Sequence, residues 1–282
     1  MKLEDYIDEY LQEITATGKS PNTVKAYKQR LSSFARFCNY YGYDFRTFNG
    51  KGSRHFRNWL LDLGLKPASI NATISAVKSF YDFLVEEEEE VKGNPIITKR
   101  LRVAEEKSLP AFLTEEEIQK VFAYIEKLQP HIALAFRTMY ACGLRVSETA
   151  NLIPEDVIIQ QGRVFVMVRH GKGNKSRMVP VTDVAVAHEL LRLAQEKEKE
   201  KGTTLFGVKN VTFKWYAQQI SFETGVDFHC HRLRHTFATK LLSEGVPLDV
   251  VQEVLGHENI NTTRKYAKTA PDRIYQLAVE VA

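Results

Sequence analysis

The sequence predicts a mainly α-helical protein of two domains, the second of which contains a small β-hairpin sheet. Apolar residues recur every three or four positions along most of the 282-residue chain, which is the period of helices with one buried face. A charged stretch that contains glycine and proline interrupts this pattern at residues 93–109. Strand-forming residues are concentrated at residues 162–181. The length allows two hydrophobic cores.

Residues 1–92 are predicted to form a four-helix bundle. The first helix is the amphipathic segment LEDYIDEYLQEITA, which ends before Gly18. Ser20-Pro21 starts the next helix, because serine caps a first turn and proline fits its first position. The apolar residues of this helix recur at helical spacing and are expected in the core: Val24, Tyr27, Leu31, Phe34, Phe37 and Tyr41. Two more helices are expected near residues 53–63 and 67–87.

We expect a linker at residues 93–109. A block of five glutamates, residues 86–90, is followed by Gly93-Asn94-Pro95, a combination that breaks helices. The next helix begins at Thr114, which forms a capping box with Glu117. The second domain is therefore expected to span residues 110–282, with strands on both sides of a Gly-Lys-Gly-Asn turn.

Composition and charge limit the classes of protein to consider. The chain has 44% hydrophobic and 26% charged residues, as an ordinary globular protein does, and no apolar run long enough to span a membrane. Its acidic N-terminal segment is unlike a secretory signal, and Cys38, Cys142 and Cys230 are too few and too scattered for a disulfide framework. We therefore expect a cytoplasmic protein.

The net charge of +4 is unevenly distributed along the chain. Residues 1–98 contain 13 basic and 13 acidic residues, whereas the remainder contains 26 and 22 of the 39 basic and 35 acidic residues in total. The whole excess lies in the second part, where a basic surface for a polyanion is expected.

Two places in the second part carry charged residues in suggestive positions. Arg145 and Glu148 are three residues apart and share one face of a helix start. Lys172 and Lys175 lie in the glycine-rich hairpin turn, from which a lysine can reach a phosphate. Taken alone, the first feature is better explained as a surface ion pair, and the second as solvated turn lysines. The turn does not match the GxxxxGK[ST] loop of nucleotide-binding proteins.

A third place is HCHRLRHTFATKLL, residues 229–242, which has a helical apolar stripe. His231, Arg234 and His235 share the neighbouring face. The segment contains no CxxC, no HExxH and no acidic residue, and its arginines would repel a cation, so we expect no metal site. Histidines beside arginines instead predict a site for an anion.

The fourth place is LGHENINTTRKYA, residues 255–267. Gly256 is positioned to end one helix and Asn261-Thr262 to cap the next. This puts His257 in a turn and Tyr266 about one turn into a helix. By itself, Tyr266 is compatible with an ordinary surface aromatic.

Together these segments resemble the tyrosine site-specific recombinases, most closely the Xer subfamily of bacteria and archaea. GLRVSE, GKGNKSRMVP, HRLRHTFAT and LGH…TTRKY occur in the family's order and spacing, and the resemblance covers nearly the whole chain. His229-Cys230 departs from the family's proline-containing lead-in. The resemblance implies an enzyme that cuts and rejoins duplex DNA without cofactor, metal or ATP.

The resemblance also implies a role for each matching residue. Arg145 and Arg234 would clamp the scissile phosphate, and His231 and His257 would hydrogen-bond it and assist proton transfer. Tyr266 would attack the phosphorus, giving a 3′-phosphotyrosyl bond and a free 5′-hydroxyl. This bond conserves the energy needed for rejoining, and fixed cationic donors stabilise the charge that develops on the phosphate oxygens.

The remaining matching residues would support this reaction. Lys172 would protonate the departing 5′ oxygen, with Lys175 as the alternative. Glu148 would orient Arg145, and His235 would be a packing residue. The N-terminal domain would be the SAM-like core-binding domain, which closes a C-shaped clamp on duplex DNA with the catalytic domain. The expected DNA-binding residues are Lys25, Lys28, Arg54, Arg57, Lys78, Lys175 and Arg177.

The tail after Tyr266 is expected to connect protomers. Its apolar residues recur at helical spacing, namely Ile274, Leu277, Ala278 and Val281. By resemblance it would dock on a neighbouring protomer and give a dimer on each site and a tetramer in the synapse; packing within its own chain is the alternative.

The expected task is resolution of circular chromosome dimers at a dif-like site, with a second Xer recombinase or a motor protein as a possible partner. The alternatives are an integrase of a phage or mobile element, a type IB topoisomerase, and a DNA-binding protein without activity.

Overall fold

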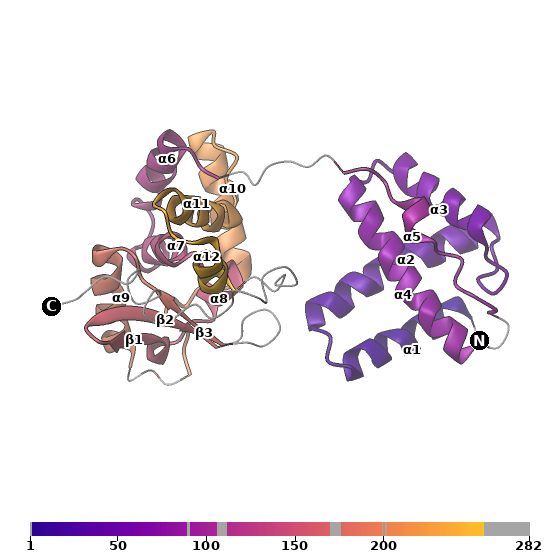
Figure 1. The fold of residues 1–282 in the computed structure, drawn as a ribbon, viewed down its shortest axis with the longest axis horizontal. Helices are drawn as coiled ribbons and strands as arrows, with labels where there is room; N and C mark the ends of the chain where they lie inside the picture. Colours follow the sequence, from indigo (N-terminus) through magenta and orange to yellow (C-terminus); the bar gives the residue numbers. More distant parts are fainter. Residues whose placement is uncertain are drawn as a thin grey trace. The chain divides into compact units, whose positions relative to one another are not determined.

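The computed structural model divides the chain into two compact units, residues 1–107 and 108–282 (Figure 1). It describes residues 2–88, 91–105, 112–169, 176–198, 200 and 202–256. Helices dominate both units, as the sequence predicts. Within this part of the chain, no helix is both long enough and apolar enough to span a membrane.

The first unit is built from four long helices and one short one. These are α1 (Leu3–Ala16), α2 (Pro21–Tyr41), α3 (Gly50–Asp62), α4 (Pro67–Glu87) and α5 (Thr98–Leu101). The expected start of α2 is confirmed, because Ser20 Oγ accepts a hydrogen bond of 3.2 Å from the Thr23 amide and Pro21 occupies the first turn.

Aromatic side chains form the centre of this unit. Phe34 of α2 is fully buried and meets Phe56 and Tyr81 edge to face. The Tyr81 hydroxyl donates a hydrogen bond of 3.0 Å to the Phe45 carbonyl oxygen, which satisfies its buried polar atom. The apolar stripe of α2 is thus a core face, except that Tyr41 in its last turn is 42% exposed.

The segment that follows α4 packs on the first unit. Ile96 and Leu101 are buried in the core of that unit. The Asn71 side chain on α4 accepts from the Val103 amide and donates to the Val103 carbonyl oxygen, both at 2.9 Å. Residues 91–105 therefore belong to this unit, whereas the sequence assigns most of them to a linker. The apolar residues of this segment are few and widely spaced. The sequence pattern therefore does not reveal that the segment docks on the first unit or that it contains a single helical turn.

In the second unit, the other helices and a sheet surround a central helix, α7 (Pro130–Cys142). The elements of this unit are α6 (Glu115–Ile125), α7, α8 (Val146–Ala150), η1 (Pro154–Asp156), β1 (Val157–Gln160), β2 (Arg163–Val168), β3 (Arg177–Pro180), α9 (Val184–Lys197), α10 (Asn210–Thr224), α11 (Cys230–Ser243) and α12 (Leu248–Leu255). The sheet is antiparallel with the order β1-β2-β3. The expected hairpin is the β2–β3 pair, and β1 is an additional edge strand.

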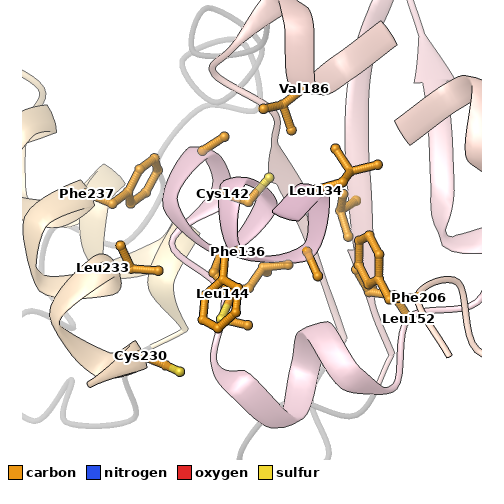
Figure 2. Packing of buried hydrophobic residues seen from close by; sticks show 14 of the residues in the cluster. Leu134, Phe136, Cys142, Leu144, Leu152, Val186, Phe206, Cys230, Leu233 and Phe237 are labelled. Atoms are coloured by element: carbon orange, nitrogen blue, oxygen red, sulfur yellow. The ribbon is translucent and has the colours of Figure 1, made fainter. Parts of the chain in front are cut away.

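Helix α7 is the centre of the second core, since nine of its 13 residues are buried. Figure 2 shows Phe237 and Leu233 on one side of α7, with Val186 and Phe206 on others. A helix that is buried on most of its surface is typical of such a central position. It provides a fixed support for the turn that follows it, residues 143–145.

Candidate active site

Arg145 is positioned by the turn between α7 and α8. Gly143 ends α7 with a positive φ of 61°, and a Cβ here would lie 2.9 Å from Leu255 Cδ2 and closer still to the Phe237 ring. The absence of a side chain thus lets this turn approach α11 and α12. Arg145 then caps α8, and its amide and its Nη1 donate to the two carboxylate oxygens of Glu148 at 2.9 and 2.6 Å.

Arg234 of α11 approaches the same carboxylate from the interior. Its side chain is only 4% exposed, and its Nη1 lies 3.8 Å from Glu148 Oε2. The guanidinium donates to the carbonyl oxygens of Gly143, at 2.8 Å, and of Leu255. The expected pair of arginines, Arg145 and Arg234, is therefore brought together around Glu148.

Arg177 of β3 completes this group, which we call the Glu148 cluster: Arg145, Glu148, Arg177 and Arg234. Arg177 Nη1 and Nη2 donate to Glu148 Oε1 and Oε2 at 3.0 and 2.9 Å. Its Nε donates to the Val254 carbonyl oxygen at 2.8 Å. Arg177 is expected from the sequence on the DNA-binding surface, whereas the structure places its side chain inside the cluster with 12% exposure.

The end of α12 is held by the same arginines. Three successive carbonyl oxygens accept hydrogen bonds from them: Val254 from Arg177, Leu255 from Arg234, and Gly256 from Arg145 at 3.1 Å. The last carbonyl groups of a helix lack partners within the helix and carry its negative dipole end, so cations are favourable here.

The Glu148 cluster contains three guanidinium groups and one carboxylate. Burial alone would raise the pKa of Glu148, but hydrogen bonds and charge from Arg177 and Arg145 outweigh burial and hold that pKa at about 2. Burial, and next the like charge of Arg145, lowers the pKa of Arg234 to about 9. The cluster thus has an excess of two positive charges in a poorly solvated place, which an anion such as a phosphate diester would offset.

His231 and His235 lie one turn apart on α11, with ring centroids separated by 5.9 Å. Partial desolvation, together with His235 and then Arg234, lowers the pKa of His231. Desolvation, with His229 and Arg234, likewise lowers the pKa of His235. Both shifts favour the neutral imidazole near pH 7, which can donate a hydrogen bond from one nitrogen and accept a proton at the other.

The remaining expected site residues fall into two groups. Lys172 and Lys175, like His257, Tyr266 and the apolar residues of the tail, lie outside the residues that the structure describes. The basic residues expected to bind DNA in the first unit are described. Lys25, Lys28 and Arg54 are exposed.

Arg57 and Lys78 already have partners in the first unit. Arg57 donates to the Asn58 side chain, with Nη2 at 2.8 Å from the amide oxygen, and Lys78 forms an ion pair of 2.7 Å with Asp82.

In the described part of the chain, no group of three or more His, Cys, Asp or Glu residues could hold a metal ion. Cys38, Cys142 and Cys230 are buried and form no disulfide.

Sequence reasoning missed the role of Arg177 as a partner of Glu148. A usable signal was present, because Arg177 belongs to the matched segment GKGNKSRMVP and starts a strand that enters the core at Val179. The contribution of Gly256 as a partner of Arg145 was equally invisible, because it uses a backbone carbonyl group.

Two family models match the chain. The model described as "Phage integrase family" matches residues 111–273, and "Phage integrase, N-terminal SAM-like domain" matches residues 7–88. A curated relative, tyrosine recombinase XerA of Pyrococcus horikoshii, is 32% identical over 99% of this chain and 93% of its own length. Tyrosine recombinase XerC of Oceanobacillus iheyensis is 35% identical over 97% and 94%.

Solved structures share the fold. The XerH site-specific recombinase bound to a palindromic difH substrate in a post-cleavage complex matches with a TM-score of 0.70 and 20% identity, over 90% of this chain and 78% of that one. A lambda integrase dimer bound to a COC' core site matches with a TM-score of 0.70 and 20% identity, over 93% and 75%.

Proposed function

Because the chain belongs to the phage integrase family and is a site-specific tyrosine recombinase, we propose that the Glu148 cluster holds the phosphate at which it cuts DNA. The observation that carries this proposal is the excess of two guanidinium charges around one buried carboxylate. Arg145 and Arg234 bind the non-bridging oxygens, while Glu148 fixes Arg145 through its amide and its guanidinium.

Tyr266 is the proposed nucleophile. Its phenolic oxygen bonds to phosphorus as the bond from phosphorus to the 5′ oxygen breaks, which gives a 3′-phosphotyrosyl bond and a 5′-hydroxyl. Lys172 supplies the proton for the departing oxygen, with Lys175 as the alternative, and His231 and His257 assist proton transfer. Attack by a 5′-hydroxyl on the phosphotyrosyl bond reverses the step, so rejoining requires neither ATP nor a metal.

The proposed substrate is duplex DNA, to which both units contribute contacts. Exposed basic residues of the first unit support this proposal, since cations on the protein surface position a DNA backbone. The proposed assembly is a dimer on each site and a tetramer in the synapse, joined by the tail after Tyr266. The relatives named tyrosine recombinase, which this chain matches over nearly their whole length, support a Xer-type task, the resolution of circular chromosome dimers at a dif-like site. A chromosomal substrate supports a reaction in the cytoplasm.

A covalent-trapping experiment tests this function. The protein is incubated with a duplex nicked beside the cleavage position of a dif-like site, in EDTA and without ATP, and an SDS-resistant adduct is expected. Tyr266→Phe should bind the duplex with unchanged Kd and form no adduct. Arg234→Gln should reduce adduct formation by about 100-fold or more, as loss of one charge-stabilising donor does. An equal yield with Tyr266→Phe would show that Tyr266 is not the nucleophile.

A further inference from the structure

We propose that Arg177 is a positioning residue for DNA cleavage. It fixes the Glu148 carboxylate and the end of α12 in place, so that Arg145 and Arg234 keep N–H groups available for the phosphate. Arg177 donates to both Glu148 oxygens and to the Val254 carbonyl oxygen, so all three of its nitrogens are engaged. This inference rests on the proposed phosphate-binding role of the Glu148 cluster.

Arg177 fits closely into its place in the protein. Its planar group makes two parallel N–H···O bonds to one carboxylate, an arrangement that lysine cannot reproduce. Gly256 leaves space for this side chain, because a Cβ at Gly256 would lie 3.0 Å from Arg177 Cδ and Nε. The side chain is therefore built into the protein interior rather than displayed to DNA.

Arg177 and Arg145 share the Glu148 carboxylate. Arg145 Nη1 and Arg177 Nη1 both bind Glu148 Oε1, at 2.6 and 3.0 Å. Arg177 Nη2 binds Oε2 at 2.9 Å, whereas Arg234 Nη1 stays 3.8 Å from that oxygen. Without Arg177, the Glu148 carboxylate would pair only with the two proposed phosphate-binding arginines and would neutralise much of their positive charge. Arg177 supplies the counter-charge and leaves Arg234 only loosely paired.

Arg177 also connects two parts of the site. Arg177 is the first residue of β3, two positions after Lys175, and its Nε holds the last turn of α12, which ends directly before Gly256 and His257. Arg177 therefore links the strand next to the lysine-containing segment with the helix next to His257. Its loss is expected to loosen the α12 end and to redirect Glu148 onto Arg145 and Arg234.

Single-turnover cleavage of the nicked duplex tests this proposal through a double-mutant cycle. Arg177→Gln should slow cleavage by about 100-fold while the Kd for DNA changes by less than about threefold. Because one of the two contacts of Arg177 acts through Glu148, Glu148→Gln/Arg177→Gln should be slowed by at least tenfold less than the product of the two single effects. Multiplying effects of the two changes would overturn the proposal, because non-additivity is the mark of residues that act as one unit. Weaker DNA binding with a reduced salt slope would overturn it too, since that result would indicate a direct phosphate contact.

Two further variants keep the test decisive if Arg177→Gln is poorly folded. Arg177→Lys keeps the charge without the paired bonds. It should remain folded with a lowered Tm and, at a temperature where it is fully folded, cleave at least tenfold more slowly; wild-type cleavage would overturn the proposal. Arg169→Gln is the matched control, because Arg169 directly follows β2 of the same sheet but is 47% exposed and pairs with Asp156. It should cleave as the wild type does.

Hydrogen exchange supplies a readout that does not depend on cleavage. In the full-length protein without DNA, amides of residues 248–256 should exchange about tenfold faster in Arg177→Lys than in wild type, and unchanged in Arg169→Gln. Unchanged exchange in Arg177→Lys would overturn the proposed anchoring of α12. If wild type fails to form the covalent adduct, the proposed function is wrong, whereas the exchange result still decides whether Arg177 holds α12.

Discussion

Glu148 is the residue on which the charge balance of the candidate site depends. Its side chain is 3% exposed and faces three guanidinium groups. A single buried carboxylate beside one arginine would form a neutral pair, but here the cations outnumber it. Hydrogen bonds and charge from Arg177 and Arg145 keep the pKa of Glu148 low, whereas burial, and next the like charge of Arg145, lowers the pKa of Arg234. Folding therefore stabilises the ionised form of Glu148 and disfavours the charged form of Arg234. A bound anion would stabilise the charged form of Arg234.

The pH dependence of stability should reveal this carboxylate. Its pKa is about 2 in the folded protein and near 4.5 when unfolded, so the unfolded chain binds the proton more tightly. The stabilisation, about 3 kcal/mol, is complete above pH 4.5 and is lost as the pH falls towards 2. Urea unfolding can be followed by Trp215 fluorescence in a Trp59→Phe background, because Trp215 belongs to the second unit.

Two variants isolate the contribution of Glu148 from those of other carboxylates. Glu148→Gln should be less stable at neutral pH and lose less free energy of unfolding between pH 5 and 2.5 than the wild type. Glu155→Gln removes an exposed carboxylate of the same unit and should follow the wild type. Parallel pH profiles for wild type and Glu148→Gln would contradict the assigned role.

At the scale of elements, the site depends on close packing of the α7–α8 turn against α11 and α12. Gly143 permits this packing, since its φ is positive and its Cα faces Phe237 and Leu255. The turn then presents Arg145 towards Glu148, while the Gly143 carbonyl oxygen accepts from Arg234 at 2.8 Å. One backbone position thus sets the separation of both proposed phosphate-binding arginines.

Gly143→Ala should destabilise the second unit severely. An alanine here combines the strain of a left-handed backbone, about 1–2 kcal/mol, with overpacking against Phe237 and Leu255, about 1–3 kcal/mol. Gly225→Ala is the matched control, because Gly225 has a φ of 68° but no atom within 4 Å of the place that a Cβ would take. Urea unfolding should give a larger loss for Gly143→Ala, by about 2 kcal/mol. Equal losses would mean that backbone strain alone matters at Gly143.

Most elements could be predicted from the sequence, because long helices with one buried face leave a periodic pattern and Thr114 or Ser20 marks where they begin. Strand β1 could not, since four residues with an intermediate-to-exposed burial pattern carry little signal. In the site, the sequence motifs identify Arg145, His231 and Arg234. They do not identify Arg177 as a partner of Glu148, because a contact across 29 residues depends on sheet register and on the position of α12.

At the scale of the whole molecule, the boundary between the two units lies later in the chain than its composition suggests. Glycine, proline and charged residues after α4 are typical of a linker, yet residues 91–105 bury Ile96 and Leu101 in the first core. Asn94 also fixes this segment, because its amide nitrogen donates to the Lys78 carbonyl oxygen at 2.8 Å and to Asp82 Oδ1 at 2.7 Å. The composition of a segment indicates how polar it is on average. Whether the segment docks on a core depends on a few spaced apolar side chains, which the average does not reveal.

Neighbouring isoleucines test whether this segment stabilises the first unit. Ile96 is 3% exposed and Ile97 is 49% exposed, so Ile96→Ala removes core contacts while Ile97→Ala removes few. Ile96→Ala should cost about 2–5 kcal/mol of unfolding free energy and Ile97→Ala less than about 1 kcal/mol. Unfolding of this unit can be followed by Trp59 fluorescence in a Trp215→Phe background. Trypsin should cut Ile96→Ala faster between residues 99 and 102, since cleavage there requires the segment to open. Equal stability and equal cleavage of the two variants would show that residues 91–105 act as a linker after all, because an undocked segment would make Ile96 as dispensable as Ile97.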